Sequence, residues 1–244
     1  MMNLKDDSHK KAYRNEWKYF CSTFRLDAIE NRLKASMQKD EHLGSNLRYI
    51  VHSLYFDDCS NMCLNDVEAG NPERFKYRIR YYNNDLSTLK IERKEKSYGY
   101  CRKYSTQLSV DEAKEIIEGD YFNLFWKTQN NMLKRFLLDL IKGNFRPKII
   151  TKYERCALED KIKNVRVTLD RNIKSSVDFY DFLSGNYTAF SMSEGNRCVI
   201  EIKFDYILPD YIKRLCYSNF MSRQTFSKYY LARKNMKRMN QWNF

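Results

Sequence analysis

The segment Arg74-Phe75-Lys76-Tyr77-Arg78-Ile79-Arg80-Tyr81 alternates basic residues with aromatic and aliphatic ones at every position. Side chains of a β-strand point to opposite faces in turn, so one face of this strand carries only Arg and Lys and the other only apolar side chains. The next stretch, 89–94, repeats the alternation. A single strand of this kind is usually a solvated sheet face, but several strands in one domain indicate a site for a polyanion.

The same alternation recurs along the rest of the chain, and it predicts a set of polar strand faces. Their residues are Glu16, Lys18, Lys76, Arg78, Arg80, Lys90, Glu92, Lys94, Lys103, Tyr153, Arg155, Arg166, Thr168, Asp170, Glu201 and Lys203. The pattern Glu-x-Lys occurs three times in this set and places a carboxylate and an ammonium on one face. Oxygen ligands hold Mg²⁺ or Mn²⁺, and Lys and Arg neutralise phosphate oxygens. The pattern therefore favours a site for a divalent metal and a phosphate chain.

Short connections rich in turn residues predict an antiparallel meander of strands at 73–82, 88–96 and 99–108. We expect further strands at 13–20, 49–57, 147–157, 165–173 and 198–205, and helices at 26–37, 61–68, 110–118, 121–141, 209–220 and 227–239. Ser109 followed by Glu112 predicts a capping box, and 178–196 is expected to be irregular. The fold class is α+β, because strands and helices do not alternate as βαβ units.

A sheet closed into a barrel would turn the polar faces inward and leave its apolar exterior to the helices. We therefore expect a closed antiparallel β-barrel tunnel of about eight strands, with a polar interior and flanking helices. The 244 residues form one domain by this interpretation, spanning 1–244.

Composition narrows the class of partner and the compartment. The formal net charge of +13 implies an anionic partner, which is a nucleic acid, an anionic membrane surface or a phosphorylated small molecule. The seven cysteines are odd in number and scattered, as is typical of free thiols in a reducing cytoplasm. The charged N-terminus lacks a signal segment, and no stretch approaches the ~20 apolar residues of a membrane span. These features predict a cytoplasmic protein.

Other catalytic signatures are missing from the sequence. No Gly-x-x-x-x-Gly-Lys or Gly-x-Gly-x-x-Gly motif occurs, so nucleotide binding of the P-loop or Rossmann type is unsupported. The three histidines, His9, His42 and His52, are scattered along the chain. We interpret His52 as a strand residue rather than a ligand.

Eight short motifs follow one another in an order that resembles the VTC-type polyphosphate polymerase domains. These belong to the triphosphate tunnel metalloenzyme, or CYTH-like, superfamily. The motifs are Arg14-x-Glu16-x-Lys18-Tyr19, Ser53-Leu54-Tyr55-Phe56-Asp57, Lys76-x-Arg78-x-Arg80, Glu92-Arg93-Lys94, Tyr153-Glu154-Arg155, Arg166-Val167-Thr168-Leu169-Asp170, Glu201-x-Lys203 and Ser227-Lys228-Tyr229. The resemblance spans 13–230 and implies a closed tunnel in which the γ-phosphate of ATP is transferred to a growing polyphosphate with Mn²⁺ or Mg²⁺.

The resemblance also implies roles for individual residues. Catalytic phosphate-binding residues would be Lys18, Arg78, Arg80, Lys94, Arg155, Arg166 and Lys203, together with Glu201. Further substrate-binding residues would be Lys76, Lys90, Lys103, Tyr153 and Lys228. The metal ligand would be Glu201, with Glu16 and Glu92 as lesser candidates. Triphosphatases and class IV adenylate cyclases typically begin with Glu-x-Glu-x-Lys, whereas Arg14 replaces the first Glu here, which favours the polymerase branch.

The expected partners are ATP and polyphosphate or pyrophosphate, with no nucleic acid and with a possible membrane partner protein that this chain does not encode. The acceptor phosphate is already ionised, so no general base is assigned.

Two alternatives stay open at this point. One is a hydrolase of tripolyphosphate or nucleoside triphosphates with the same fold, and the other is a non-enzymatic polyanion-binding module.

Overall fold

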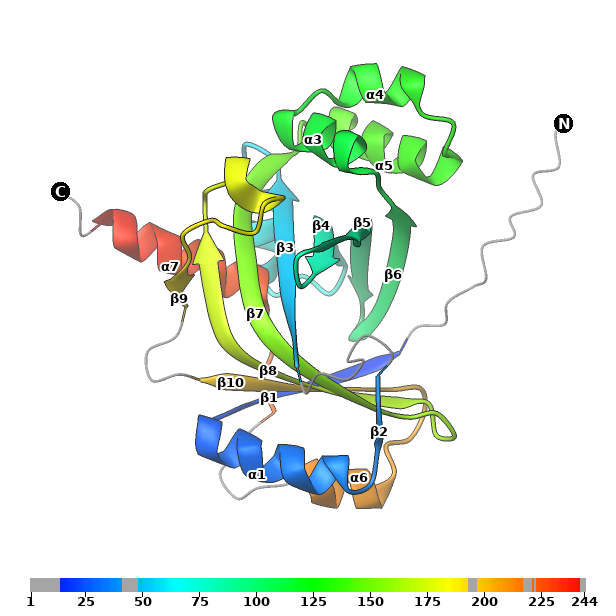
Figure 1. Cartoon of the computed structure of the whole chain (residues 1–244), viewed down its shortest axis with the longest axis vertical. Helices are drawn as coiled ribbons and strands as arrows, with labels where there is room; N and C mark the ends of the chain where they lie inside the picture. Colours follow the sequence, from blue (N-terminus) through cyan, green and yellow to red (C-terminus); the bar gives the residue numbers. More distant parts are fainter. Residues whose placement is uncertain (1–13, 41–47, 193–196, 217–220, 222, 242–244) are drawn as a thin grey trace, which may run out of the picture.

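Figure 1 shows the computed structural model of the chain, in which residues 14–40, 48–192, 197–216, 221 and 223–241 are described. One antiparallel sheet organises the molecule, and its main strands follow the order β1-β10-β8-β7-β3-β4-β5-β6. Their bounds are β1 Asn15–Cys21, β3 Tyr49–Asp57, β4 Arg74–Tyr82, β5 Asp85–Ser97, β6 Tyr100–Gln107, β7 Arg146–Asp160, β8 Val165–Ser176 and β10 Cys198–Phe204. Two short strands extend the sheet, since β2 (Gln38–Lys39) pairs with β7 and β9 (Phe190–Ser191) pairs with β8.

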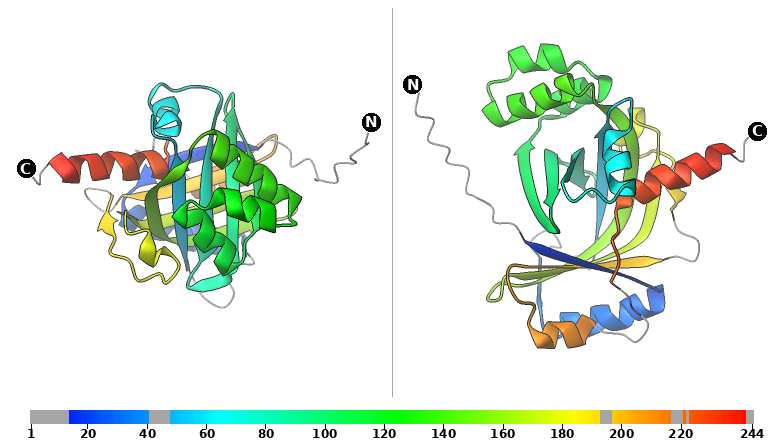
Figure 2. Two further views of the ribbon diagram at one scale, coloured as in Figure 1. Left: turned by 90° about the horizontal axis from the view of Figure 1, so that it is seen from above. Right: turned by 180° about the vertical axis from the view of Figure 1, so that it is seen from behind.

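The sheet is strongly curled, so that its two ends approach each other. The backbone groups of Arg14 and Cys101 exchange hydrogen bonds of 3.4 and 3.3 Å, which joins the start of β1 to β6 at the far end of the strand order. Figures 1 and 2 show the strands wrapping around a common interior. The predicted antiparallel sheet of about eight strands is confirmed as a curled, half-barrel sheet.

Helices cover the outer face of the sheet. Two helices, α1 (Thr23–Lys34) and α6 (Asp210–Cys216), lie against each other below β1 and β10. Three helices gather beside β5 and β6, namely α3 Val110–Glu118, α4 Tyr121–Lys127 and α5 Asn131–Lys142. The remaining α-helices, α2 (Met62–Glu68) and α7 (Lys228–Gln241), contact each other behind β3, β4 and β7. A 3-10 turn, η2, spans Tyr180–Phe182.

The apolar half of the alternating pattern forms the core between the sheet and these helices. On β4, the side chains of Tyr77, Ile79 and Tyr81 are fully buried. The ring of Tyr77 packs edge-on against Phe136 of α5, with ring centroids 6.1 Å apart. Burial of apolar surface is the main favourable term in folding, so the same alternation that produces the polar face also holds the helices in place.

Several predicted elements are confirmed, including β3 and α3 at their predicted bounds. At the start of α3 the Ser109 hydroxyl accepts from the Glu112 backbone N–H (3.1 Å). The Ser109 N–H in turn donates to the Glu112 carboxylate (2.8 Å), which completes the predicted capping box. The predicted single helical region 121–141 is wrong, because it is two helices. The chain leaves α4 at Lys127, and the Asn130 side chain then caps α5 by accepting from two backbone N–H groups.

Other boundaries shift for identifiable reasons. The strand expected from 88 starts at Asp85, because Asn83 adopts a positive φ of 53° and makes the β4–β5 turn tight. The stretch 178–196, expected to be irregular, contains η2 and β9, and β2 was not predicted. The predicted helix 209–220 is described as α6 up to Cys216. Its last residues lie outside the described part, as do Tyr13, His9 and His42.

All seven cysteines are free thiols, as expected. Among the described residues, none of the helices has both the length and the apolar character that a bilayer crossing requires.

One polar group in the outer core is a buried histidine on β3. His52 is fully buried, stacks on the Tyr81 ring with centroids 4.4 Å apart, and its Nδ1 lies 2.6 Å from the Tyr187 hydroxyl. Burial, followed by the nearby Lys152 ammonium, lowers the pKa of His52 from 6.5 to about 4. The histidine is therefore a neutral core residue on a strand, in agreement with its interpretation as a strand residue.

This environment predicts acid sensitivity. The unfolded chain binds a proton at His52 below pH 6.5, whereas the folded chain does so only below about pH 4. Its contribution to stability is thus complete above pH 6.5 and is lost as the pH falls toward 4, up to about 3 kcal/mol. Urea unfolding across this range should show a flatter pH dependence for His52→Gln than for the wild type. Parallel curves for the two proteins would contradict the assignment.

Candidate functional site

The strand register brings the predicted polar faces onto one side of the curled sheet, called here the inner face. Glu16 lies opposite Lys203, and Lys18 lies opposite Glu201, in the β1–β10 ladder. The curl then joins strands that are far apart in the sheet order. The Lys94 ammonium of β5 is 2.7 Å from the Glu16 carboxylate of β1. Fourteen of the fifteen sequence-predicted site residues lie on strands of this face. The fifteenth, Lys228, begins α7.

One cluster on the inner face pairs two carboxylates with three lysines. The Lys18 ammonium lies 2.6 Å from Glu16 and 3.4 Å from Glu201, and so bridges them. Lys203 lies 2.9 Å from Glu201. Burial and the neighbouring Glu201 oppose ionisation of Glu16, but the three ammoniums outweigh them and hold the pKa of Glu16 below its usual range. Both carboxylates are therefore ionised at neutral pH.

A second cluster surrounds the fully buried Glu92. Arg78 donates from Nε to one of its oxygens at 2.6 Å, and Lys103 donates to the other at 3.0 Å. The Arg80 guanidinium lies 3.7 Å from the same carboxylate and donates to the Ser53 hydroxyl at 3.2 Å. Burial disfavours the charged form of Glu92, yet the surrounding cations hold its pKa well below the normal value. Glu92 thus fixes the direction of both arginines of the Arg-x-Arg motif.

A third cluster centres on the fully buried Asp170. Arg155 donates to both oxygens of Asp170, at 2.7 and 2.8 Å, in a bidentate pair. The Lys228 ammonium donates to the same carboxylate at 2.6 Å. Both cations stand over the Tyr153 ring, at 5.2 and 4.6 Å from its centroid. The aromatic ring and the carboxylate together hold two positive charges side by side.

Three further predicted cations lie on the same face with other partners. Lys76 donates to the Ser227 hydroxyl at 2.6 Å, and burial, followed by repulsion from neighbouring cations, lowers its pKa to about 7. Lys90 stands over the Tyr82 ring at 5.4 Å. Arg166 lies at the edge of the face, where it pairs with the buried Asp40 at 2.9 Å.

The segment that leads into α7 completes the inner face. Lys18 donates to the Phe226 carbonyl at 3.0 Å, and Ser227 and Lys228 reach the interior from the start of the helix. Buried Asp57 anchors this arrangement. It accepts from the backbone N–H groups of Cys63 (2.9 Å) and Leu64 in α2 and from the Tyr229 hydroxyl of α7.

The donor set fits a divalent cation that completes its coordination with phosphate. Glu16 and Glu201 share the Lys18 ammonium, so their carboxylates converge. In the part of the chain that the structure describes, no group of three or more His, Cys, Asp and Glu residues gathers as a metal cage. Mg²⁺ is typically held by one or two carboxylates plus substrate phosphates, and a two-carboxylate arrangement meets that requirement. Glu92, the third predicted ligand, belongs to a separate cluster.

Sequence reasoning missed residues that organise these clusters. Tyr55 and Ser227 stand in the motifs that carry the family resemblance, yet neither is among the predicted site residues. Asp170 is predicted on the polar face, but without a role in binding or catalysis. The period-two alternation of their strands places Asp170 and Tyr55 on the same face as predicted site residues, and this alternation was the sequence signal for their position. Asp40, the partner of Arg166, follows the unpredicted strand β2, and nothing in its local sequence indicated its position.

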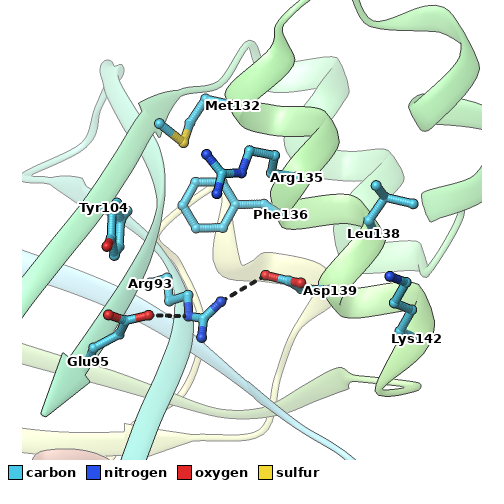
Figure 3. A pocket seen from close by; sticks show the side chains of 9 residues that line it. All are labelled: Arg93, Glu95, Tyr104, Met132, Arg135, Phe136, Leu138, Asp139 and Lys142. Atoms are coloured by element: carbon cyan, nitrogen blue, oxygen red, sulfur yellow. Dashed lines mark hydrogen bonds and ion pairs between the residues drawn. The ribbon is translucent and has the colours of Figure 1, made fainter. Parts of the chain in front are cut away.

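A separate open pocket of about 280 Å³ lies on the outer side of the sheet, between α5 and the strands β5 and β6. Figure 3 shows Arg93 in it, held between Glu95 and Asp139 at 3.0 Å each. Its lining residues are Arg93, Glu95, Tyr104, Met132, Arg135, Phe136, Leu138, Asp139 and Lys142. The central cation is already neutralised by two acids, so this pocket does not share the chemistry of the inner face.

Comparisons with known proteins give the family of this chain and solved structures of similar fold. The model of the family described as VTC domain matches residues 13–237. A putative adenylyl cyclase from Hippeastrum, described as having a dominant triphosphatase activity, is similar in structure. Its TM-score is 0.56 and its identity 16%, with 91% of this chain and 95% of that chain covered. A putative adenylate cyclase from Bacillus halodurans gives a TM-score of 0.48 and 15% identity, covering 83% and 84%. No curated protein matches the sequence.

The three-way ion pair at Asp170 makes a prediction about stability. Asp170→Asn leaves two buried cations without their counter-charge, so the free energy of unfolding should fall by about 3 kcal/mol. The matched control is Asp205→Asn, which breaks a partly exposed pair with Arg14 at 2.9 Å and should cost less than about 1 kcal/mol. Chemical denaturation measures both. Equal losses for the two variants would mean that burial of the Asp170 cluster contributes nothing.

Proposed function

Since the chain belongs to the VTC domain family, we propose that it is a polyphosphate polymerase, which transfers the γ-phosphate of ATP to a growing inorganic polyphosphate chain. The family and the curled sheet make it a tunnel-fold enzyme related to polyphosphate and triphosphate chemistry. The observation that carries the finer proposal is the inner face. Lysines from three strands, β1, β5 and β10, converge there on the two adjacent carboxylates Glu16 and Glu201. Cations from further strands and from α7 surround Glu92 and Asp170 on the same face.

We propose that the curled sheet acts as a closed tunnel. The Arg14–Cys101 bridge joins its edges, β1 and β6, and the Lys94–Glu16 ion pair crosses the interior from β5 to β1. The start of α7 covers the interior by placing Ser227 and Lys228 against it. A linear substrate would lie along the axis of such a space, in contact with cations on every side.

The charge of the inner face supports a polyphosphate rather than a neutral ligand. Its cations are Lys18, Lys76, Arg78, Arg80, Lys90, Lys94, Lys103, Arg155, Arg166, Lys203 and Lys228. Its carboxylates are Glu16, Glu92, Asp170 and Glu201, and the cations outnumber them more than two to one. Buried charges of one sign are costly unless an anion joins them, and a phosphate chain supplies charge at every unit.

Positioning and charge neutralisation account for the proposed transfer. Arg78 and Arg80, held by Glu92, would bind the equatorial oxygens of the transferred phosphoryl group. Arg155 and Lys228 would bind the neighbouring phosphates. The attacking oxygen belongs to an acceptor phosphate that is ionised at neutral pH, so alignment in line with the leaving group matters more than a general base. We assign no base.

Glu201 and Glu16 would hold the divalent cation, Mn²⁺ or Mg²⁺, and Lys18 would keep the two carboxylates in register. When bound, such an ion supplies charge neutralisation at the phosphate oxygens and helps to orient them. Glu92 stays a lesser candidate, because it lies in a separate cluster with Arg78, Arg80 and Lys103 and has no second carboxylate beside it there.

A hydrolase of tripolyphosphate or nucleoside triphosphates is the second candidate. The Hippeastrum protein, which shares the fold, is described as a triphosphatase, and this observation favours it. Against it, Arg14 stands where triphosphatases of this superfamily typically have a glutamate. Arg14 pairs with Asp205 outside the Glu16–Glu201 cluster, so the first strand contributes one carboxylate to that cluster.

The two candidates differ in their products. Purified protein with ATP and Mn²⁺ should form ADP and long-chain polyphosphate, resolved by gel electrophoresis. Orthophosphate as the main product from ATP or tripolyphosphate would instead establish the hydrolase, and neither product would leave only a polyanion-binding module. Glu201→Ala should abolish turnover, and retained activity in this variant would remove the metal assignment.

Neighbouring residues on β5 separate the inner face from the outer one. Lys94 points inward to Glu16, whereas Arg93 points outward to Asp139. Lys94→Ala should lower kcat/KM for ATP by about 100-fold, as expected when a group that stabilises the developing charge is lost. Arg93→Ala should change it by less than about twofold and is the matched control. The proposal fails if the two substitutions have equal effects on kcat/KM while both proteins stay folded.

A further inference from the structure

Two turns at one end of the molecule carry exposed apolar side chains at their tips. Ile162, in the turn between β7 and β8, is 91% exposed. Tyr206 and Ile207, which directly follow β10, are 93% and 81% exposed. A single exposed apolar residue is common on protein surfaces, but three on neighbouring turns indicate an interaction site.

Polar contacts join these two turns into one surface, defined here as the Ile162–Ile207 surface. Asn164 donates to the Asp205 carboxylate, and the Tyr211 hydroxyl donates to Asp160. Arg14 ties both turns to the first strand, because its guanidinium donates to the Asn164 carbonyl and pairs with Asp205 at 2.9 Å. Figures 1 and 2 show the β7–β8 turn and the segment after β10 at the same end, beside the start of β1.

Basic side chains surround the apolar tips. Lys161 and Lys163 flank Ile162 on both sides and are exposed, as are Lys213 and Arg214 in the last turn of α6. The nearby carboxylates are engaged within the chain. Asp205 pairs with Arg14, Asp160 accepts from Tyr211, and Asp210 pairs with Lys213 at 2.9 Å. Lys161 also lies 3.4 Å from the Glu159 carboxylate, in a surface ion pair of the kind that contributes little and that a lipid phosphate can replace. The surface therefore combines protruding apolar groups with exposed basic side chains.

We propose that the Ile162–Ile207 surface docks this protein on an anionic lipid membrane. Ile162 and Ile207 would insert below the headgroups, Tyr206 would lie at the interface, and Lys161 and Lys163 would contact the lipid phosphates. Tyrosine prefers this interfacial level, and lysines next to an apolar tip extend toward the headgroups. Attraction to anionic lipids adds to the buried apolar area, as for other peripheral proteins.

The shape of the surface favours a lipid layer over a protein partner. A stable protein interface buries a continuous apolar core of roughly 800 Å² on each side, ringed by polar groups. Here the apolar groups are isolated tips on separate turns, with charged residues between them. Such tips can enter a deformable lipid interface one by one. This docking is independent of the proposed polymerase function, because binding to vesicles requires no turnover.

Co-sedimentation of the full chain with vesicles tests the proposal. The protein should bind vesicles of phosphatidylcholine and phosphatidylglycerol in equal parts, and should bind phosphatidylcholine vesicles about tenfold less. The double variant Ile162→Ser/Ile207→Ser should lower the affinity on the order of tenfold. Lys161→Ser and Lys163→Ser should each lower it about fivefold, and high salt should do the same to the wild type.

Matched controls come from apolar tips elsewhere on the surface. Phe24 is 85% exposed on α1 and Tyr180 is 98% exposed on η2. Phe24→Ser and Tyr180→Ser should leave vesicle binding unchanged, and all variants should keep the wild-type melting temperature. The proposal is overturned if the wild type binds neither vesicle, or if the controls lose binding equally. It is also overturned if sedimentation velocity shows that Ile162 and Ile207 instead join two copies of the chain.

Discussion

Four buried carboxylates determine where most cations of the inner face lie. Glu16, Glu92, Glu201 and Asp170 each hold two or more Lys or Arg side chains, and each lies on a different strand. Without these acids, mutual repulsion would drive the long basic side chains apart or out to solvent. The acids therefore fix the positions of the basic side chains. The inner face stays net positive because each acid pairs with more than one cation.

The outer face of the same strands explains why so polar an interior can be stable. Many of the inward Lys and Arg residues have apolar sequence neighbours, such as Tyr77 and Ile79 beside Arg78, that point the other way and are buried in the outer core. The apolar contacts on the outside offset the desolvation of charges on the inside. Period-two alternation thus lets one strand supply both the charged inner face and the apolar outer face. A shift of the strand register by one residue would exchange the two faces.

The sequence predicts most of this architecture because the alternation is local. The strand bounds, the capping box at Ser109 and the polar set from Glu16 to Lys203 follow from residue order alone. The grouping of that set into three clusters does not, because it depends on which strands the curl brings together, as Lys94 and Glu16 illustrate. The break between α4 and α5 was also missed, since apolar periodicity runs through Thr128 and only the cap at Asn130 restarts the helix.

The pairing of β1 with β10 has a consequence for how the molecule is made. Residues 15–21 pair with 198–204, and Lys18 also donates to the Phe226 carbonyl. The β1 strand therefore cannot complete its contacts until residues about 180 to 210 positions later have been synthesised. Contacts so distant in sequence are slow to form, since a long loop must be closed before they contribute. During synthesis the β3–β6 meander can fold early, whereas the charged interior is complete only once the C-terminal helix has emerged from the ribosome.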